Sequence, residues 1–304
     1  MRDFQIIVIG GGHAGIEAAA ACARMGLATA LISGDLKRIG EMSCNPAVGG
    51  VGKGQLVREI DALGGLIGLL TDRAGIHFRV LNRSKGPAVW SSRAQTDRKL
   101  YREHAGAAVA EIENLTLVAG MVVGVVAEQG RFRAVRLRSG EMLSADACIL
   151  AAGTFLNGLI HIGNKQIAAG RINEDPALLL SESLQDYGFE TGRLKTGTPP
   201  RLDGSTIDFG ALEEQPGDEQ IKPFSLRTKS APQNRAVCYI TYTQSATHEL
   251  IRANLQRSAM FSGNIEGIGP RYCPSIEDKV HRFAEKPRHQ LFLEPEGLDT
   301  NEIY

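Results

Sequence analysis

The chain has 304 residues, of which 43% are hydrophobic and 22% charged, as is typical of a globular protein with one large or two ordinary domains. Lys plus Arg and Asp plus Glu both number 34, so the net charge alone predicts neither nucleic-acid binding nor membrane binding. No apolar run approaches the length of a membrane span, and we expect no signal peptide because strand-like sequence starts at Phe4.

The first predicted element is a buried strand over residues 4–9, which leads through G-x-G-x-x-G into an alanine-rich helix over residues 16–25. This glycine pattern is weak by itself, but between a strand and a helix it indicates a dinucleotide-binding turn. Gly10 permits the turn, Gly12 lets the backbone approach a pyrophosphate, and Gly15 lets the helix pack on the strand. The free N–H groups of the helix then face the phosphates. An ordinary glycine-rich turn is the less favoured interpretation.

Residues 28–32 form the second predicted strand, and Asp35 follows at the spacing of an acid that contacts a ribose hydroxyl, unless it lies past the strand end. The glycine-rich segment 44–54 is similar to a P-loop. Ala47 stands at its first glycine position, however, and Gly54 replaces the Ser or Thr that would bind magnesium. We therefore predict no nucleoside triphosphate site here. Its small residues instead let the backbone approach a flat ligand.

Residues 115–150 alternate with turn signals at 129–130 and 139–140, which predicts a β-meander. Its arginines favour a solvated strand surface over an RNA contact: Arg131, Arg133, Arg136 and Arg138. The meander leads into a buried strand at 147–150 that ends in Ala-Gly-Thr. This ending resembles the second strand motif of flavoproteins with two dinucleotide-binding domains, where the strand returns beside the first and passes close to FAD. The resemblance favours FAD over NAD at the glycine turn.

The sequence predicts an α/β fold, with a Rossmann-like FAD-binding domain over residues 1–195 that combines a parallel sheet and a β-meander. From about Thr196 the chain becomes rich in turns, Pro and charge. We therefore expect an inserted smaller α/β domain, for NAD or substrate, over residues 196–270, with a helix at 247–256. Residues 271–304 would return to the FAD domain.

The five cysteines are widely spaced and lack a C-x-x-C pair, which argues against a disulfide scaffold or a zinc site and suits a reducing cytoplasm. Cys22, Cys148 and Cys238 lie in apolar elements and are interpreted as core residues. Cys44 and Cys273 lie in loops and are the candidates for a reactive thiol.

Charged residues surround the second candidate. Arg271 and Lys279 could supply the positive charge that activates Cys273, whereas Glu277 and Asp278 oppose it. The histidines show no metal-ligand spacing, and we predict no metal site. Arg98 and Arg102, one helical turn apart, are interpreted as a solvated helix face, with a phosphate-binding stripe as the alternative.

Seven segments together resemble one family. They are GGGHAG at 10–15, MSCNPAVGGVGKG at 42–54, DALGG at 61–65, SKGPA at 84–88, LKTGTPPR at 194–201, GPRYCPSIEDK at 269–279 and LEPEGLDTNEIY at 293–304. The resemblance is to the tRNA uridine 5-carboxymethylaminomethyl modification enzymes, the MnmG (GidA) family, and it covers essentially the whole chain.

The resemblance implies a cytoplasmic, FAD-dependent enzyme that acts on carbon 5 of the wobble uridine of certain tRNAs. It implies a homodimer that works with the GTPase MnmE, uses NADH to reduce the flavin, and takes a one-carbon unit from a folate donor. The family's two functional cysteines match Cys44 and Cys273. One would add to uracil and the other would assist proton or carbon handling, and either assignment is open.

The cofactor contacts that the glycine motif and the resemblance imply are Gly10, Gly11, Gly12, His13, Ala14, Gly15, Val122, Gly153, Thr154, Pro270, Arg271, Tyr272, Glu277, Asp278 and Lys279. Those from Pro270 onward match the family's NAD-binding segment. Members of the family continue for about as long again, so we expect the chain to be an N-terminal fragment.

Three other interpretations compete with this one. The related folate- and FAD-dependent tRNA uridine methyltransferases share the glycine motif but match segments 42–46 and 269–279 less well. A flavin disulfide reductase would need a C-x-x-C-type pair. A non-catalytic remnant that only folds or binds a partner is the third.

Overall fold

The computed structural model describes residues 3–153, 155–163, 165–172, 174–195, 197–263, 265, 267 and 274–304. Thr154, Pro270, Arg271, Tyr272 and Cys273 lie outside the described residues, and their roles stay predictions. Within the described parts of the chain, the helices are too short or too polar to cross a lipid bilayer.

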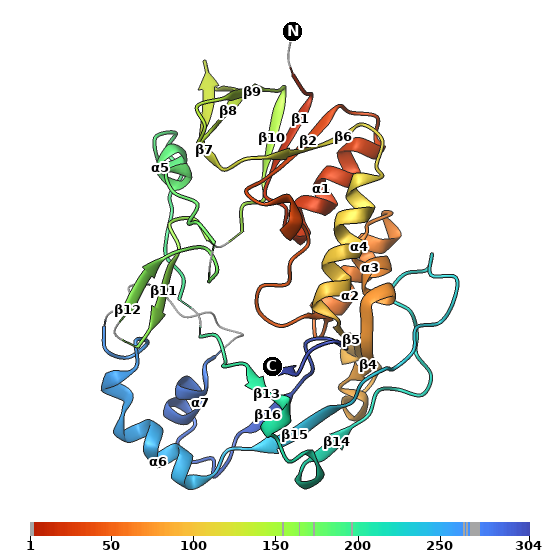
Figure 1. The fold of residues 1–304 in the computed structure, drawn as a ribbon, viewed down its shortest axis with the longest axis vertical. Helices are drawn as coiled ribbons and strands as arrows, with labels where there is room; N and C mark the ends of the chain where they lie inside the picture. Colours follow the sequence, from red (N-terminus) through yellow and green to blue (C-terminus); the bar gives the residue numbers. More distant parts are fainter. Residues whose placement is uncertain are drawn as a thin grey trace.

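A parallel sheet in the order β10-β1-β2-β6 forms the top of the molecule as seen in Figure 1. Its strands are β1 (Ile6–Ile9), β2 (Thr29–Ser33), β6 (Leu115–Ala119) and β10 (Ala147–Leu150). Helix α1 (His13–Arg24) connects β1 to β2. The parallel pairing of β10 with β1 confirms the prediction that the strand at 147–150 returns beside the first strand. The prediction that this strand is buried was wrong, because β10 lies at the edge of the sheet, with Ile149 and Leu150 exposed.

The central strands are apolar on both faces because both faces of the sheet are covered. On one face, Val8 and Leu31 pack in a core with Ile16 of α1. On the other, Ile7 and Ile32 pack in a second core that includes residues of an antiparallel sheet. That sheet is the predicted meander, in the order β7 (Val122–Glu128), β8 (Arg131–Leu137) and β9 (Met142–Ser144). Leu115–Ala119 is not part of the meander as predicted, because it pairs with β2.

A second layer extends the first core away from the parallel sheet. It contains an antiparallel sheet in the order β3-β5-β4, with strands β3 (Ala47–Gly49), β4 (Gly75–Leu81) and β5 (Ser91–Thr96). It also contains the helices α2 (Lys53–Ala62), α3 (Ile67–Ala74) and α4 (Arg98–Ala110). Glu17 of α1 joins this layer to the first, because its carboxylate accepts from the amides of Leu66 and Ile67 at the start of α3. The glycine-rich segment thus folds as a short strand, a turn and a helix.

The remaining elements lie mostly in the lower half of Figure 1. They are β11 (Leu159–Ile162), β12 (Lys165–Ala168), α5 (Leu180–Gln185), β13 (Leu202–Asp203), β14 (Glu213–Gln215), β15 (Cys238–Tyr242), α6 (Ser245–Ala253), α7 (Ile276–Arg282), β16 (Gln290–Leu293) and β17 (Glu302–Ile303). Helix α6 confirms the helix expected near 247–256. Strand β16 pairs with β15, and β17 with β13, so residues 271–304 share sheets with residues 196–270. The division into domains stays a prediction.

Candidate functional site

The turn between β1 and α1 presents the amino end of a helix at the edge of the parallel sheet. Gly10 has φ +108, which favours glycine, and a Cβ there would overlap the carbonyl oxygen of Ala151. Gly15 packs so closely that its Cβ would overlap the carbonyl oxygen of Gly10. Among the described residues, no heavy atom lies within 4 Å of a Cβ built on Gly12, and no side chain caps α1 there. The turn therefore leaves the positive end of α1 open at Gly12.

The other residues predicted at this turn are also in place. The carbonyl oxygen of Gly11 accepts from the amide of Gly40 at 2.8 Å, and Ala14 is exposed on the first turn of α1. Gly153 follows β10 with φ +73, in the segment whose Ala151 amide donates to the Ile9 carbonyl at 2.8 Å. The end of β10 thus lies against the glycine turn, as predicted, and its contact with a cofactor stays a prediction.

Val122 contributes to the core rather than to an open surface. Its side chain is 3% exposed and packs in the second core with Ile7 and Ile32. A cofactor contact at Val122 would have to come from its backbone, and it too stays a prediction.

His13 begins α1 and stacks near Tyr101, with ring centroids 5.4 Å apart. Burial, together with the charges of Lys53 and Arg171, lowers the pKa of His13 to about 4. These two cations therefore lie close to the glycine turn. Neither was singled out by the sequence analysis, although Lys53 belongs to the glycine-rich segment.

We expect His13 to make the FAD-free chain less stable in acid. Its imidazole is neutral in the folded state down to about pH 4, whereas it titrates near its ordinary value of 6.5 in the unfolded chain. The contribution of His13 to the free energy of unfolding should therefore be fully present above pH 6.5 and should be lost as the pH falls toward 4. When the pH is lowered from 7 to 4, the free energy of unfolding of His13→Gln, measured by urea titration, should fall by about 1–2 kcal/mol less than that of the unaltered chain. Equal losses would contradict this interpretation of His13.

Cys44 is exposed in the loop that precedes β3. Its backbone is held from two directions, because Arg98 Nη2 donates to the Cys44 carbonyl oxygen at 2.9 Å and Arg201 Nη2 donates to the same oxygen. Its Sγ lies 3.6 Å from Tyr304 Oη, within hydrogen-bonding distance for sulfur. The neighbouring Ser43 Oγ accepts from Arg171 Nε at 2.7 Å. The loop thus presents an accessible thiol on a fixed backbone.

Two buried carboxylates from the Leu293–Tyr304 motif support this loop. Glu296, 2% exposed, lies 2.8 Å from Arg98 Nη2 and 2.6 Å from Arg201 Nε. Burial raises the pKa of Glu296, and both arginines oppose that effect. Glu294, 3% exposed, accepts from Arg93 at 2.7 Å and from Asn45 Nδ2 at 2.7 Å. Asn45 directly, and the Cys44 carbonyl through Arg98 and Arg201, are therefore tied to the same C-terminal segment.

We expect Glu294→Gln to destabilise the chain by about 2 kcal/mol, because buried hydrogen bonds to a charged group contribute more than neutral ones. Chemical denaturation should show the loss as a lower midpoint. Glu128→Gln is the matched control, since Glu128 is 68% exposed in its side chain and lies 3.4 Å from Arg133. It should change stability by less than about 0.5 kcal/mol. A similar effect of both changes would refute the structural role of Glu294.

Of the other described cysteines, Cys238 is buried as predicted for a core residue, whereas Cys148 and Cys22 are only partly buried. Burial raises the pKa of the Cys148 thiol to about 12, and burial does the same for Cys238. Cys22 is partly buried in α1. The four described cysteines are free thiols, and of these Cys44 is the exposed one. Cys273, the second predicted reactive thiol, lies outside the described residues and stays a prediction.

The described part of the predicted NAD-binding segment is helix α7. Ser275 caps it by accepting from the Asp278 amide at 3.2 Å, and Asp278 lies 3.7 Å from Arg282. Lys279 follows on the same helix, with its amide bonded to the Ser275 carbonyl. The Glu277 side chain contacts the segment that follows α6, because its carboxylate accepts from Ser258 Oγ at 3.3 Å.

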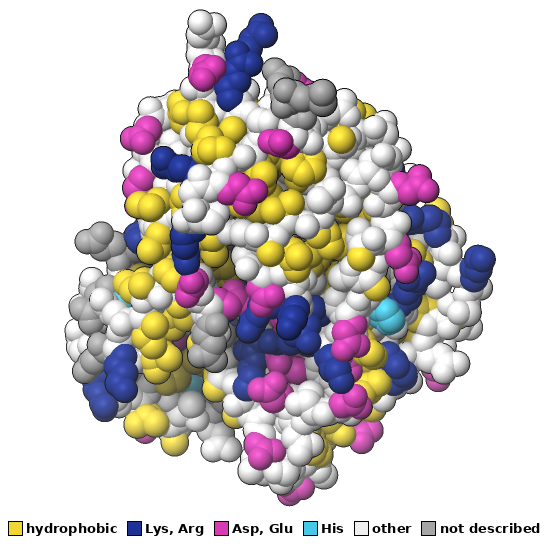
Figure 2. Space-filling model, turned by 45° about the horizontal axis from the view of Figure 1, so that its top comes forward, with side chains coloured by type: hydrophobic (Ala, Val, Ile, Leu, Met, Phe, Trp, Pro, Cys, Tyr) yellow, Lys and Arg dark blue, Asp and Glu magenta, His cyan; other side chains and the backbone are white. Residues whose placement is uncertain are grey.

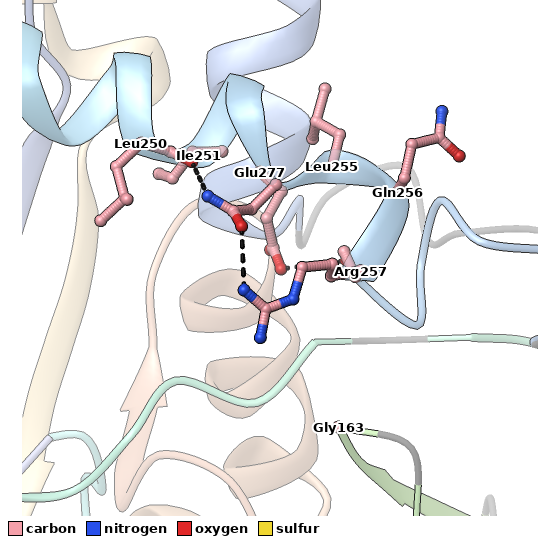
Figure 3. A pocket seen from close by; sticks show the side chains of 9 residues that line it. Gly163, Leu250, Ile251, Leu255, Gln256, Arg257 and Glu277 are labelled. Carbon is pink, nitrogen blue, oxygen red and sulfur yellow. Dashed lines mark hydrogen bonds between the residues drawn. The ribbon is translucent and has the colours of Figure 1, made fainter.

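Glu277 lines a pocket of about 650 Å³ between α6, the turn that follows it, and α7. Figure 3 shows Glu277 close to Arg257, with Leu250 and Ile251 on the neighbouring helix. Arg257 is held by Asn254, whose Oδ1 accepts from it at 3.0 Å. The pocket is open to solvent and combines apolar and polar side chains.

The helix arginines do not form the solvated face that the sequence predicted. Arg98 pairs with Glu296, and Arg102 lies 3.0 Å from Glu41, which is 8% exposed. Tyr101 between them is fully buried. The expectation was wrong because the acidic partners lie on other elements, where helical spacing gives no sign of them.

The described residues contain no group of three or more His, Cys, Asp and Glu side chains placed to hold a metal ion. The described residues offer a glycine turn open to phosphate, an exposed thiol on a fixed loop and a pocket of mixed polarity beside α7.

Comparisons with known proteins agree over the whole chain. The family described as glucose inhibited division protein A matches residues 5–304. Two relatives named tRNA uridine 5-carboxymethylaminomethyl modification enzyme MnmG, from Thermodesulfovibrio yellowstonii and Geobacter sulfurreducens, are 56% and 54% identical over 303 residues. These alignments cover 100% of this chain and 49% and 48% of the relatives.

A solved structure of GidA from Aquifex aeolicus superimposes with a TM-score of 0.93 at 50% identity, over 99% of this chain and 51% of that chain. A second crystal form of the same protein gives a TM-score of 0.91. The chain therefore spans about half the length of the relatives it matches.

Proposed function

Because the chain belongs to the glucose inhibited division protein A family, we propose that it forms the FAD-binding, thiol-bearing part of a tRNA wobble-uridine modification enzyme. The proposed reaction adds a carboxymethylaminomethyl group to carbon 5 of the wobble uridine. The identity of 54–56% to relatives named as MnmG over this whole chain carries the proposal.

The glycine turn fits FAD by its shape and polarity. The amides at Gly11, Gly12 and His13 would hold the pyrophosphate, since no described atom occupies the space a Cβ on Gly12 would enter. Lys53 and Arg171, whose charges act on His13, would add positive charge beside the phosphates. Bound FAD would supply the redox and carbon-transfer chemistry that side chains lack.

The thiol chemistry follows from the electronic structure of uracil. Carbon 5 is a poor nucleophile until a thiolate adds to carbon 6, which forms an enolate-like species whose carbon 5 attacks the electrophilic one-carbon unit. Loss of the carbon 5 proton and expulsion of the thiolate restore the ring. Cys44 is exposed on a loop held by Arg98 and Arg201, so it is open to an approaching base. Cys44 and Cys273 would divide the nucleophilic and the assisting roles.

The substrate is proposed to be tRNA, whose anticodon-loop base is unpaired and can enter a pocket at small unstacking cost. The net charge of the chain is zero, but Figure 2 shows Lys and Arg side chains gathered near the middle of one face, with carboxylates among them. Local cationic surface of this kind supports contact with phosphates.

We propose that NADH binds at the pocket beside α7, where Glu277 and Arg257 provide polar contacts. Asp278 and Lys279 extend the same segment, with Pro270, Arg271 and Tyr272 preceding it in the sequence. A folate one-carbon donor, the GTPase MnmE, a homodimeric state and a cytoplasmic location complete the proposal, supported by the family relationship and by the free cysteines.

The test is a reconstituted modification assay. The chain would be incubated with FAD, NADH, a folate one-carbon donor, glycine or ammonium, MnmE and unmodified tRNA, and the wobble nucleoside analysed by mass spectrometry. We expect the carboxymethylaminomethyl product, dependent on each component. A chain that binds FAD but gives no product would show that the activity requires the part of the relatives it does not span. A chain that binds no FAD would favour a non-catalytic remnant.

A further inference from the structure

We propose that Tyr304 is a positioning residue for Cys44, and that its hydroxyl donates a hydrogen bond to the Cys44 thiolate. The inference rests on the proposed function, in which Cys44 acts through its sulfur. The observation behind it is the 3.6 Å separation of Tyr304 Oη and Cys44 Sγ, which joins residues 260 positions apart in the sequence.

The backbone of Tyr304 is fixed to the segment that supports the thiol loop. Its amide donates to the Glu294 carbonyl at 2.8 Å, and the Glu294 amide donates to the Tyr304 carbonyl at 2.9 Å. The Glu294 side chain in turn accepts from Asn45, the residue after Cys44. The tyrosine and the cysteine loop are therefore held by the same buried carboxylate residue.

The tyrosine ring is fixed by Arg201. The guanidinium lies over the ring, 4.7 Å from its centroid, and donates both to Glu296 and to the Cys44 carbonyl oxygen. One planar cation thus contacts the ring, the backbone of the cysteine and a buried carboxylate. Such a planar group can make these contacts at once, which a lysine ammonium does not reproduce. The hydroxyl and the sulfur are held at a set separation by this arrangement.

Thiol chemistry indicates which group donates in this hydrogen bond. The thiolate is the reactive form of a cysteine, and a hydroxyl that donates to it favours the charged form. Arg98 and Arg201 both donate to the carbonyl oxygen of the same residue and so fix its backbone. Tyr304 would therefore orient the sulfur and donate to it in its reactive form.

The test is the alkylation rate of Cys44 in the Tyr304→Phe variant. The chain would be treated with iodoacetamide at neutral pH, and each cysteine followed by peptide mass spectrometry. Loss of the hydroxyl should slow alkylation of Cys44 about threefold, because the sulfur loses the donor that contacts it in its reactive, charged form. Phenylalanine keeps the ring beneath Arg201, so the fold should be retained, with an unchanged circular dichroism spectrum and thermal midpoint.

Tyr242→Phe is the matched control. It removes the same hydroxyl from a ring that also lies under an arginine, with Arg288 4.1 Å from the centroid, but on strand β15. It should leave the Cys44 rate unchanged. A second variant, Arg201→Lys, keeps the charge but breaks the simultaneous contacts, and should also slow Cys44 alkylation. A Cys44 rate in Tyr304→Phe equal to or above that of the unaltered chain would overturn the proposal.

Alkylation needs neither tRNA nor FAD, so this result is independent of whether the chain modifies tRNA. In an active modification assay, Tyr304→Phe should lower kcat about threefold and leave the KM for tRNA unchanged. A raised KM with unchanged kcat would also contradict a positioning role.

Discussion

Gly12→Val is expected to abolish FAD binding while the chain still folds. Gly12 has φ −76, which valine adopts easily, and a Cβ there meets no described heavy atom within 4 Å. The new side chain would instead occupy the space where the pyrophosphate must approach α1. We expect at least about a 100-fold loss of affinity in a flavin-fluorescence titration, which removes about 2.7 kcal/mol of ligand-derived stability at saturating FAD.

The control for this prediction is the FAD-free chain. Without FAD, Gly12→Val should change the free energy of unfolding by less than about 1 kcal/mol. Gly15→Ala should behave differently, because its Cβ would overlap the Gly10 carbonyl oxygen, and should destabilise the FAD-free chain by more than about 2 kcal/mol. Retained flavin affinity in Gly12→Val would place the cofactor elsewhere.

The second large effect is expected at the two cysteines predicted to be reactive, Cys44 and Cys273. In an active modification system, Cys44→Ser and Cys273→Ser should each lower the rate by at least about a thousandfold and leave flavin binding unchanged, since a serine hydroxyl is a far weaker nucleophile than a thiolate. Mass spectrometry of the wobble nucleoside measures the rate, and the flavin spectrum reports cofactor retention.

Cys22→Ser is the matched control for this pair, because Cys22 is partly buried in α1 and has no proposed chemical role. It should change the modification rate by less than about twofold. If either loop variant keeps full activity, that cysteine has no part in the proposed chemistry.

The sequence was sufficient to predict the glycine turn and the strands around it, because these features depend on local pattern. The run Ile6–Ile9 is apolar throughout, as expected of a strand covered on both faces, and Gly10 and Gly15 are required by close backbone contacts. The strand at 147–150 could be placed beside it because its Ala-Gly-Thr ending resembles a known arrangement.

The supports of Cys44 could not be predicted in the same way. The Arg93–Glu294 contact joins residues 201 positions apart, and Arg201 and Tyr304 reach the cysteine loop across 157 and 260 positions. No periodicity connects such residues, so they appear only when the chain is folded. Arg201, Glu294 and Tyr304 belong to the motifs at 194–201 and 293–304, but membership in these motifs did not indicate any role for them.

The error over Arg98 and Arg102 has the same origin. Their spacing correctly predicted that both arginines lie on one side of a helix. Their ion-pair partners, Glu296 and Glu41, lie on other segments of the chain, which the spacing does not predict. A charged helix face in sequence is therefore weak evidence for solvent exposure.

The most direct test of the account is a crystal structure of this chain grown with FAD. We predict that the pyrophosphate lies within hydrogen-bonding distance of the backbone amides at Gly11, Gly12 and His13, with the end of β10 beside the cofactor. Electron density for FAD at another place, or a turn at Gly12 filled by side chains in the presence of saturating FAD, would contradict the account.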